Sequence, residues 1–204
     1  MPHANTPTNT HPPNAASKLV GPRGQVIGVD MTDEQLAVAR AHVDWHTQRY
    51  EYSTPNVRFE KGLIEDLSTV GVADGSVDVV VSNCVLNLSP SKPRVLQEVF
   101  RVLKPGGELY FSDVFCDRRL PAALREDQEV LGECLGGAMY IEDFRRLLAD
   151  ELGCKDYRVM EEAPIDITDE AIAAKVGLGG GVWCGAGWRP VVAAALNPDR
   201  PTDL

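Results

Sequence analysis

The sequence lacks any apolar run that approaches the roughly 20 residues needed for a membrane-spanning helix. Its first 17 residues, rich in Pro, Thr and Asn, contain no apolar core of a signal peptide. We therefore expect a cytoplasmic protein with no membrane partner, whose five cysteines are reduced thiols rather than a disulfide framework. CxxC spacing is also missing, which excludes the ordinary zinc-finger and thioredoxin patterns.

Basic residues are scarce as well. The chain has 20 Lys and Arg against 30 Asp and Glu, a formal net charge of −10. Phosphate backbones repel so acidic a body, so we expect no nucleic-acid partner. The 204 residues, 44% of them hydrophobic, suffice for one globular domain, which we expect to act as a monomer. The five cysteines are then the feature that needs an explanation.

Residues 1–17 carry too little apolar surface to offset the entropy of ordering, so we expect a disordered tail there. Beyond it, short β-branched runs alternate with helical patterns. Strands are predicted at 25–30, 56–61, 76–81, 108–113 and 157–160, and helical segments at 32–45, 64–67, 91–103, from 122 onward and at 141–152. This alternation predicts an α/β fold, a Rossmann-like, doubly wound and mainly parallel sheet, with 76–81 buried on both faces.

Two patterns suggest ligand sites but lack the required spacing. The run Gly177–Gly181 fails the GxGxxG pattern because Val182 occupies the third glycine position, so we expect a divergent, flexible Gly-rich tail over 171–204. His42 and His46 could form part of a zinc site on one helix face. No third ligand is evident near them, and a solvated helix face is the favoured interpretation.

Asp30 ends an apolar predicted strand. A carboxylate there can accept hydrogen bonds from both ribose hydroxyls of a nucleoside cofactor, or it can favour the dipole of the following helix. Its spacing alone leaves both interpretations open. Ser82 and Asp113 do not indicate a hydrolase, because no GxSxG elbow exists. The strand VIGVD, the later strand VDVVV and the segment LKPGGELYFSD together resemble class I S-adenosylmethionine-dependent methyltransferases.

More specific segments narrow this resemblance. SNCVLNLS and GECLGGA, with VIGVDMTDEQLAVAR and NVRFEKGLIEDL, are similar to the arsenite methyltransferases over roughly residues 18–170. The resemblance implies arsenic detoxification, with arsenite or its thiol conjugates as substrate, S-adenosylmethionine as cofactor and glutathione or thioredoxin as reductant. It also implies that trivalent arsenic binds Cys84 and Cys134. The implied cofactor residues are Asp30, Met31, Ile64, Glu65, Asn83 and Val85.

The implied chemistry suits thiols. Trivalent arsenic is soft, as are the metals that prefer thiolate ligands, and it keeps a lone pair that can attack the cofactor methyl directly. Since no proton need be removed from this nucleophile, catalysis rests mainly on positioning. The resemblance assigns no role to Cys116, Cys154 or Cys184, and we expect Cys154 to be a packing residue.

The chain also departs from the family. No GxGxG occurs before Gly24, and residues 14–24 resemble the end of the helix that follows that loop in the family. The expectation is therefore a domain without the first strand, the Gly-rich loop and the family's third arsenic-binding cysteine, with an open sheet edge and weak cofactor binding. Two alternatives to an arsenite methyltransferase follow. One is a non-catalytic remnant that binds metalloid through Cys84 and Cys134, and the other is a related small-molecule methyltransferase.

Overall fold

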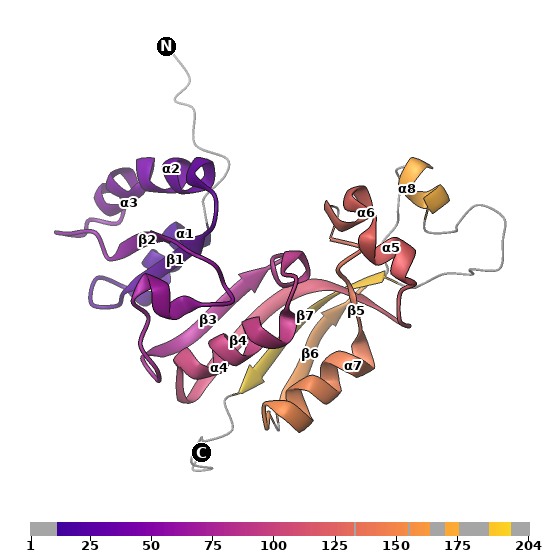
Figure 1. Ribbon diagram of the computed structural model, residues 1–204. Coiled ribbons are helices and arrows are strands. Elements are labelled where there is room, and N and C mark those ends of the chain that lie inside the picture. Colours follow the sequence, from indigo (N-terminus) through magenta and orange to yellow (C-terminus); the bar gives the residue numbers. More distant parts are fainter. Residues whose placement is uncertain (1–11, 133, 155, 164–169, 176–187, 197–204) are drawn as a thin grey trace. The chain divides into compact units, whose positions relative to one another are not determined.

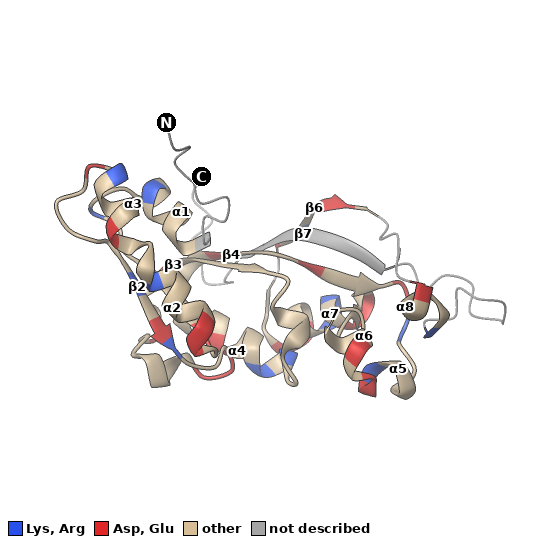
Figure 2. Ribbon diagram, turned by 90° about the horizontal axis from the view of Figure 1, so that it is seen from above, with Lys and Arg blue, Asp and Glu red and all other residues tan. Residues whose placement is uncertain are grey.

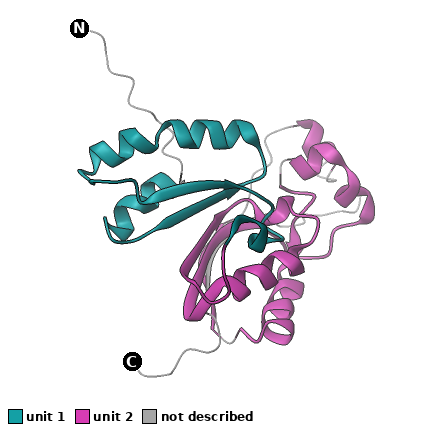
Figure 3. Ribbon diagram, turned by 60° about the vertical axis from the view of Figure 1, so that its left-hand side comes forward, with its two compact units in different colours: residues 1–71 teal, residues 72–204 magenta. Residues whose placement is uncertain are grey.

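The computed structural model describes residues 12–132, 134–154, 156–163, 170–175 and 188–196 (Figure 1). The chain divides into two compact units, residues 1–71 and 72–204 (Figure 3). Both units combine strands with helices, which confirms the predicted α/β class. None of the described helices is long and apolar enough to cross a membrane.

Unit 1 is built on two parallel strands. Its elements are α1 (Pro12–Val20), β1 (Val26–Asp30), α2 (Asp33–Ala41), α3 (Val43–Arg49), β2 (Val57–Lys61) and a 3-10 helix (Leu67–Val70). β1 pairs with β2 from Val26 opposite Val57 to Asp30 opposite Lys61. α2 buries its apolar side against β2, through Leu36, Ala39, Val57 and Phe59. The two strands therefore end side by side, and the segments that follow them share one edge of the sheet.

The N-terminal segment is more ordered than its composition predicts. Residues 12–17 belong to α1, so the expected disorder is wrong there, whereas residues 1–11 lie outside the described residues. Polar contacts anchor this helix. Asn14 is fully buried and donates to the Ala39 carbonyl (3.5 Å), and Ser17 donates to the Asn56 side chain. Long-range hydrogen bonds thus help to hold α1 in place, although its sequence has few apolar residues to bury.

The two histidines do not share one helix. α2 ends at Ala41 and α3 begins at Val43, so His42 is the residue between them. His46 is buried, with its ring edge-on to Trp45 (centroids 4.7 Å apart), and this burial lowers the pKa of the imidazole. The expectation of a solvated helix face is therefore wrong for His46. The helix breaks at His42, and the His46 ring packs between the rings of Trp45 and Tyr50.

Unit 2 contains a mixed sheet with the order β3-β4-β7-β6, with β5 beside the end of β4. Its strands are β3 (Val77–Asn83), β4 (Leu103–Cys116), β5 (Met139–Tyr140), β6 (Tyr157–Glu162) and β7 (Trp188–Leu196). Its helices are α4 (Lys92–Val102), α5 (Ala122–Glu126), α6 (Gln128–Gly132), α7 (Ile141–Arg146) and α8 (Glu170–Lys175), with a 3-10 helix at Leu86–Leu88 and a π-helix at Leu147–Glu151. β3 and β5 run parallel to β4, whereas β7 is antiparallel to both β4 and β6.

β3 is less buried than its apolar sequence predicts. Val79 is 47% exposed and Val81 68% exposed, so the expected burial on both faces is wrong. Figures 1 and 2 show α4 and α7 on the same face of the sheet. Val79 and Val81 lie in register with Glu108 and Tyr110 of β4, away from the buried Leu109. Val80 is accordingly half-buried, whereas Val79 and Val81 are exposed, and no residue of β3 is fully buried.

The C-terminal stretch also differs from its prediction. Residues 188–196, expected within a flexible tail, form β7, which pairs with β4 from Glu108 opposite Leu196 to Cys116 opposite Trp188. β7 pairs with two strands that are distant from it in the sequence, and the preceding glycines obscure this non-local pairing. The run 177–181 lies outside the described residues.

Candidate functional site

Cys84 lies directly after β3, at the carboxyl end of that strand. Its backbone N–H donates to the Ser112 carbonyl of β4 (2.8 Å), which continues the strand pairing by one residue. The chain then leaves the sheet, and Cys84 adopts a φ of 52° in the left-handed region that favours glycine. Its side chain is exposed. The strand end thus presents a thiol in a strained backbone conformation, a feature that clusters at functional sites.

Cys134 lies in the loop after α6 and shares this conformation, with a φ of 62°. Its N–H donates to the Leu131 carbonyl (3.0 Å), and its thiol donates to the Cys84 carbonyl with a Sγ–O distance of 3.6 Å. Two cysteines 50 residues apart in the sequence are therefore brought together. Among the described residues, Glu51 is the sole other non-glycine residue with a positive φ.

Glycines in the second loop permit this approach. A Cβ on Gly137 would lie 1.9 Å from the Asn87 carbonyl oxygen, which belongs to the turn after Cys84. A Cβ on Gly136 would lie 2.9 Å from the Leu124 carbonyl oxygen. Real Cβ atoms essentially never approach other atoms this closely. Gly137 therefore lets the backbone of the Cys134 loop pack on the turn after Cys84, and Gly136 lets the same loop pack against the Leu124 carbonyl.

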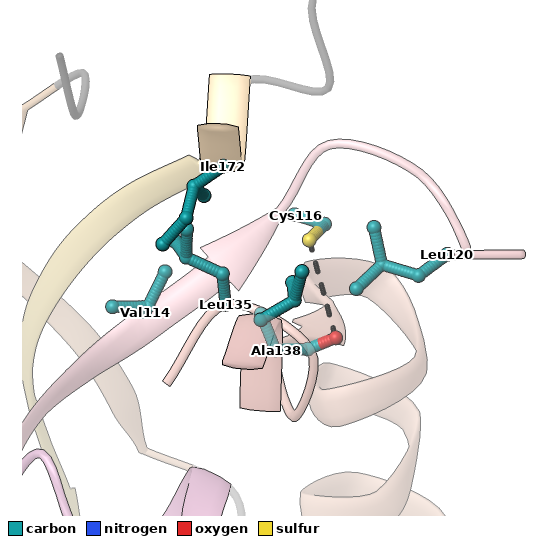
Figure 4. Packing of buried hydrophobic residues seen from close by; sticks show 7 residues of the cluster. Val114, Cys116, Leu120, Leu135, Ala138 and Ile172 are labelled. Atoms are coloured by element: carbon teal, nitrogen blue, oxygen red, sulfur yellow. Dashed lines mark hydrogen bonds between the residues drawn. The ribbon is translucent and has the colours of Figure 1, made fainter. Parts of the chain in front are cut away.

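A compact apolar cluster supports the Cys134 loop. Cys134 packs against this cluster, whose buried members are Val114, Cys116, Leu120, Val130, Leu135, Ala138 and Ile172 (Figure 4). Cys116 is one of its members, and its thiol donates weakly to the Ala138 carbonyl at 3.9 Å (Figure 4). Burial raises the pKa of the Cys116 thiol to about 12. Cys154 is buried too, as predicted, and Cys184 lies outside the described residues.

Asp113 and Asn87 organise the turn after Cys84. Asp113 is 1% exposed, and its carboxylate accepts the N–H groups of Val114 (2.8 Å), Asn87 (3.1 Å) and Leu86. Asn87 is also buried and donates through Nδ2 to the Val114 carbonyl (2.6 Å). Neither residue is predicted from the sequence to belong to the site. A single acidic residue inside the apolar run YFSDVF is the signal that could have indicated this role.

The charge of Asp113 also affects the thiol. Although Cys84 is exposed as a residue, partial desolvation of its thiol first, and then the Asp113 carboxylate, raise the pKa of Cys84, while a hydrogen bond with Ser112 acts in the opposite direction. Burial likewise raises the pKa of Asp113, against the hydrogen bonds from backbone N–H groups. These effects together disfavour the thiolate form of Cys84.

Four of the six predicted cofactor residues lie in unit 1, at the shared edge of β1 and β2. The Asp30 carboxylate ends β1, and the exposed Met31 follows it. The Asp30 carbonyl accepts the N–H of Gly62 (3.0 Å), which ties the segment with Ile64 and Glu65 to the end of β1. These two form a turn, and the predicted helical segment at 64–67 begins only at Leu67.

The other two predicted cofactor residues lie in unit 2, on either side of Cys84. Asn83 is the last residue of β3 and its Oδ1 accepts a hydrogen bond from Ser112 (2.6 Å). Val85 is 41% exposed and precedes the 3-10 helix. Their assignment to a cofactor stays a prediction, as does that of the residues in unit 1.

The left-handed backbone at Cys84 leads to a test of strain. Replacing Cys84 by Gly should give a protein about 1 kcal/mol more stable than Cys84→Ala, because Gly adopts this φ without steric cost. Urea unfolding of both variants measures the difference. A Cys84→Gly variant no more stable than Cys84→Ala would contradict strain at this residue.

Comparisons with known proteins identify relatives of the chain. A family model described as "Methyltransferase domain" matches residues 12–164. An arsenite methyltransferase of Aquipseudomonas alcaligenes is 58% identical over 161 residues, which cover 79% of this chain and 46% of that protein. The human arsenite methyltransferase is 44% identical over 161 residues, 79% of this chain and 43% of that protein. The chain thus spans about half the length of these curated relatives, and the resemblance predicted from the sequence is confirmed.

Solved structures resemble the chain too. The crystal structure of an arsenic(III) S-adenosylmethionine methyltransferase from Chlamydomonas reinhardtii matches with a TM-score of 0.77 and 44% identity, over 93% of this chain and 60% of that one. The YcgJ protein from Bacillus subtilis, 17% identical, shares the fold with a TM-score of 0.59, over 87% of this chain and 83% of that one. Because the family model covers well over half of the sequence, the chain belongs to the methyltransferase domain family.

Proposed function

We propose that this chain methylates trivalent arsenic, held by Cys84 and Cys134, with S-adenosylmethionine as the methyl donor. The observation that carries the proposal is the contact between the two cysteine loops, with the Cys134 thiol 3.6 Å from the Cys84 carbonyl oxygen and both residues in the left-handed region. Names of relatives that share 58% and 44% of their aligned residues with this chain support arsenic as the substrate.

The thiols capture arsenite by condensation. Each S–H meets an As–OH group, an As–S bond forms, and the hydroxyl leaves as water with the thiol proton. Two thiols on adjoining loops then hold the arsenic atom in one place, which is the positioning that a direct attack by its lone pair requires.

Asp30 fits the ribose of the methyl donor. Its Oδ1 accepts from the N–H and the hydroxyl of Thr32 (2.8 and 2.7 Å), and no described residue engages its Oδ2, which can therefore accept from a ribose hydroxyl. Met31, Ile64 and Glu65 follow at the same edge of unit 1, and Asn83 and Val85 are the proposed cofactor residues of unit 2. The bound cofactor supplies a methyl group on a positively charged sulfur.

The thiol chemistry also suggests where the protein works. All four described cysteines are free, and capture of arsenic requires Cys84 and Cys134 to stay reduced. We therefore propose a reducing compartment, the cytoplasm, and a thiol reductant such as glutathione or thioredoxin as co-substrate.

Binding of phenylarsine oxide, which bridges two neighbouring thiols, tests the proposal. Cys84→Ser and Cys134→Ser should each weaken binding at least tenfold, because one thiol of the chelate is lost. Cys154→Ala removes a buried thiol of the same unit and should leave the affinity unchanged. Equal affinity of the wild-type chain and both serine variants would contradict arsenic capture by this pair.

Transfer of a labelled methyl group to arsenite separates the alternatives. The proposed enzyme forms a methylated arsenical that both serine variants fail to make. Arsenical binding without transfer would favour the non-catalytic metalloid binder. Methyl transfer to other small molecules, without arsenical binding, would favour a related methyltransferase.

A further inference from the structure

We propose that Asn87 is a positioning residue that sets the spacing of Cys84 and Cys134 for an arsenical, an inference that rests on the proposed function. Asn87 is 2% exposed and lies three residues after Cys84, inside the 3-10 helix Leu86–Leu88. It belongs to the turn after Cys84 and contacts both the end of β4 and the Cys134 loop.

Its bonds to β4 fix the Cys84 turn. The Asn87 backbone N–H donates to Asp113 Oδ2 (3.1 Å), and its side-chain amide donates to the Val114 carbonyl (2.6 Å). The Cys84 N–H is bound to the Ser112 carbonyl (2.8 Å) on the same strand. The turn between Cys84 and Asn87 is therefore tied to β4 at both ends.

The Asn87 carbonyl faces the second loop. A Cβ added to Gly137 would lie only 1.9 Å from the Asn87 carbonyl oxygen, so a side chain at position 137 would collide with it. The Lys92 ammonium donates a hydrogen bond to the same oxygen (3.4 Å). Gly137 is three residues after Cys134, so this backbone contact lies close to both thiols in the chain. Moving Asn87 would change the separation of the two loops, and with it the fit of any ligand that must reach both sulfur atoms.

The role predicts a difference between two-thiol and one-thiol reactions. Asn87→Ala should lower the affinity for phenylarsine oxide at least tenfold, because chelation needs both thiols at one spacing. The rate at which iodoacetamide alkylates Cys84, followed by peptide mass spectrometry, should change less than about twofold, because Cys84 is exposed and reacts alone. A purely structural role would not separate these two readouts.

Glu98→Gln is the matched control. Glu98 is equally buried, in α4 of the same unit, and bonds Arg101, so its loss should lower stability without lowering arsenical affinity. Should Asn87→Ala fail to fold, Asp113→Asn decides the question, since it replaces one acceptor oxygen of the same network by a donor. Its arsenical affinity should also fall.

The outcomes separate this inference from the function on which it rests. No chelation by the wild-type chain would overturn both. Chelation by the wild-type chain that is lost in Cys84→Ser but unchanged in Asn87→Ala and Asp113→Asn would overturn the inference alone. A selective loss of chelation in Asn87→Ala, with Cys84 alkylation retained, supports it.

Discussion

Gly137→Ala is expected to lower the free energy of unfolding by about 3 kcal/mol, near the upper end for overpacking, and to weaken chelation of phenylarsine oxide. The added Cβ would stand 1.9 Å from the Asn87 carbonyl oxygen, and backbone has to shift because no flexible side chain can yield. The two cysteine loops must then separate. Urea unfolding followed by circular dichroism measures the first effect, and titration with the arsenical measures the second.

Gly132→Ala provides the control within the same Gly-rich segment. A Cβ on Gly132 meets nothing within 4 Å, and this glycine ends α6 with an exposed position. We expect stability and arsenical affinity close to those of the wild-type chain. If both alanine variants behaved alike, steric contact between the loops would not explain the Gly-Gly pair.

Several elements of the fold could be predicted because local patterns determine them. The β-branched run before Asp30 is β1, and the helical spacing that ends before Pro105 is α4. Features that depend on distant partners could not be predicted in this way. β7 exists through its pairing with β4 and β6, and the exposure of β3 depends on which faces the helices cover.

The same division holds for the candidate site. Cys84 and Cys134 were predicted from short segments that resemble a family, and the structure brings them together. The residues that hold them in place were missed. Asp113 accepts a hydrogen bond from Asn87, 26 positions away, and the Gly137 backbone contacts Asn87 across 50 positions. No local sequence pattern could predict either contact.

Phe144→Ala should cost about 4 kcal/mol of unfolding free energy without altering the site. Phe144 is 2% exposed in α7, and its ring lies 5.4 Å from Phe111, 4.9 Å from Phe115 and 5.9 Å from Tyr157, measured between centroids. Truncation would leave a cavity under the sheet that these rings can fill only in part. Urea unfolding measures the loss, and arsenical affinity of the folded protein should remain that of the wild-type chain.

Tyr157→Phe tests the same group of aromatic rings, but here the free energy of unfolding is expected to rise. The Tyr157 hydroxyl is buried and has no hydrogen-bond partner among the described residues, and burial raises its pKa to about 12. Deleting it removes an unsatisfied polar group while it keeps the ring, so stability should rise by about 1 kcal/mol. A loss of stability in Tyr157→Phe would show that the hydroxyl is solvated or bonded, whereas equal losses in both variants would contradict aromatic packing as the source of the Phe144 effect. Neither Phe144 nor Tyr157 contacts the cysteine loops through a described interaction. The two variants should therefore change the free energy of unfolding in opposite directions while arsenical affinity stays constant.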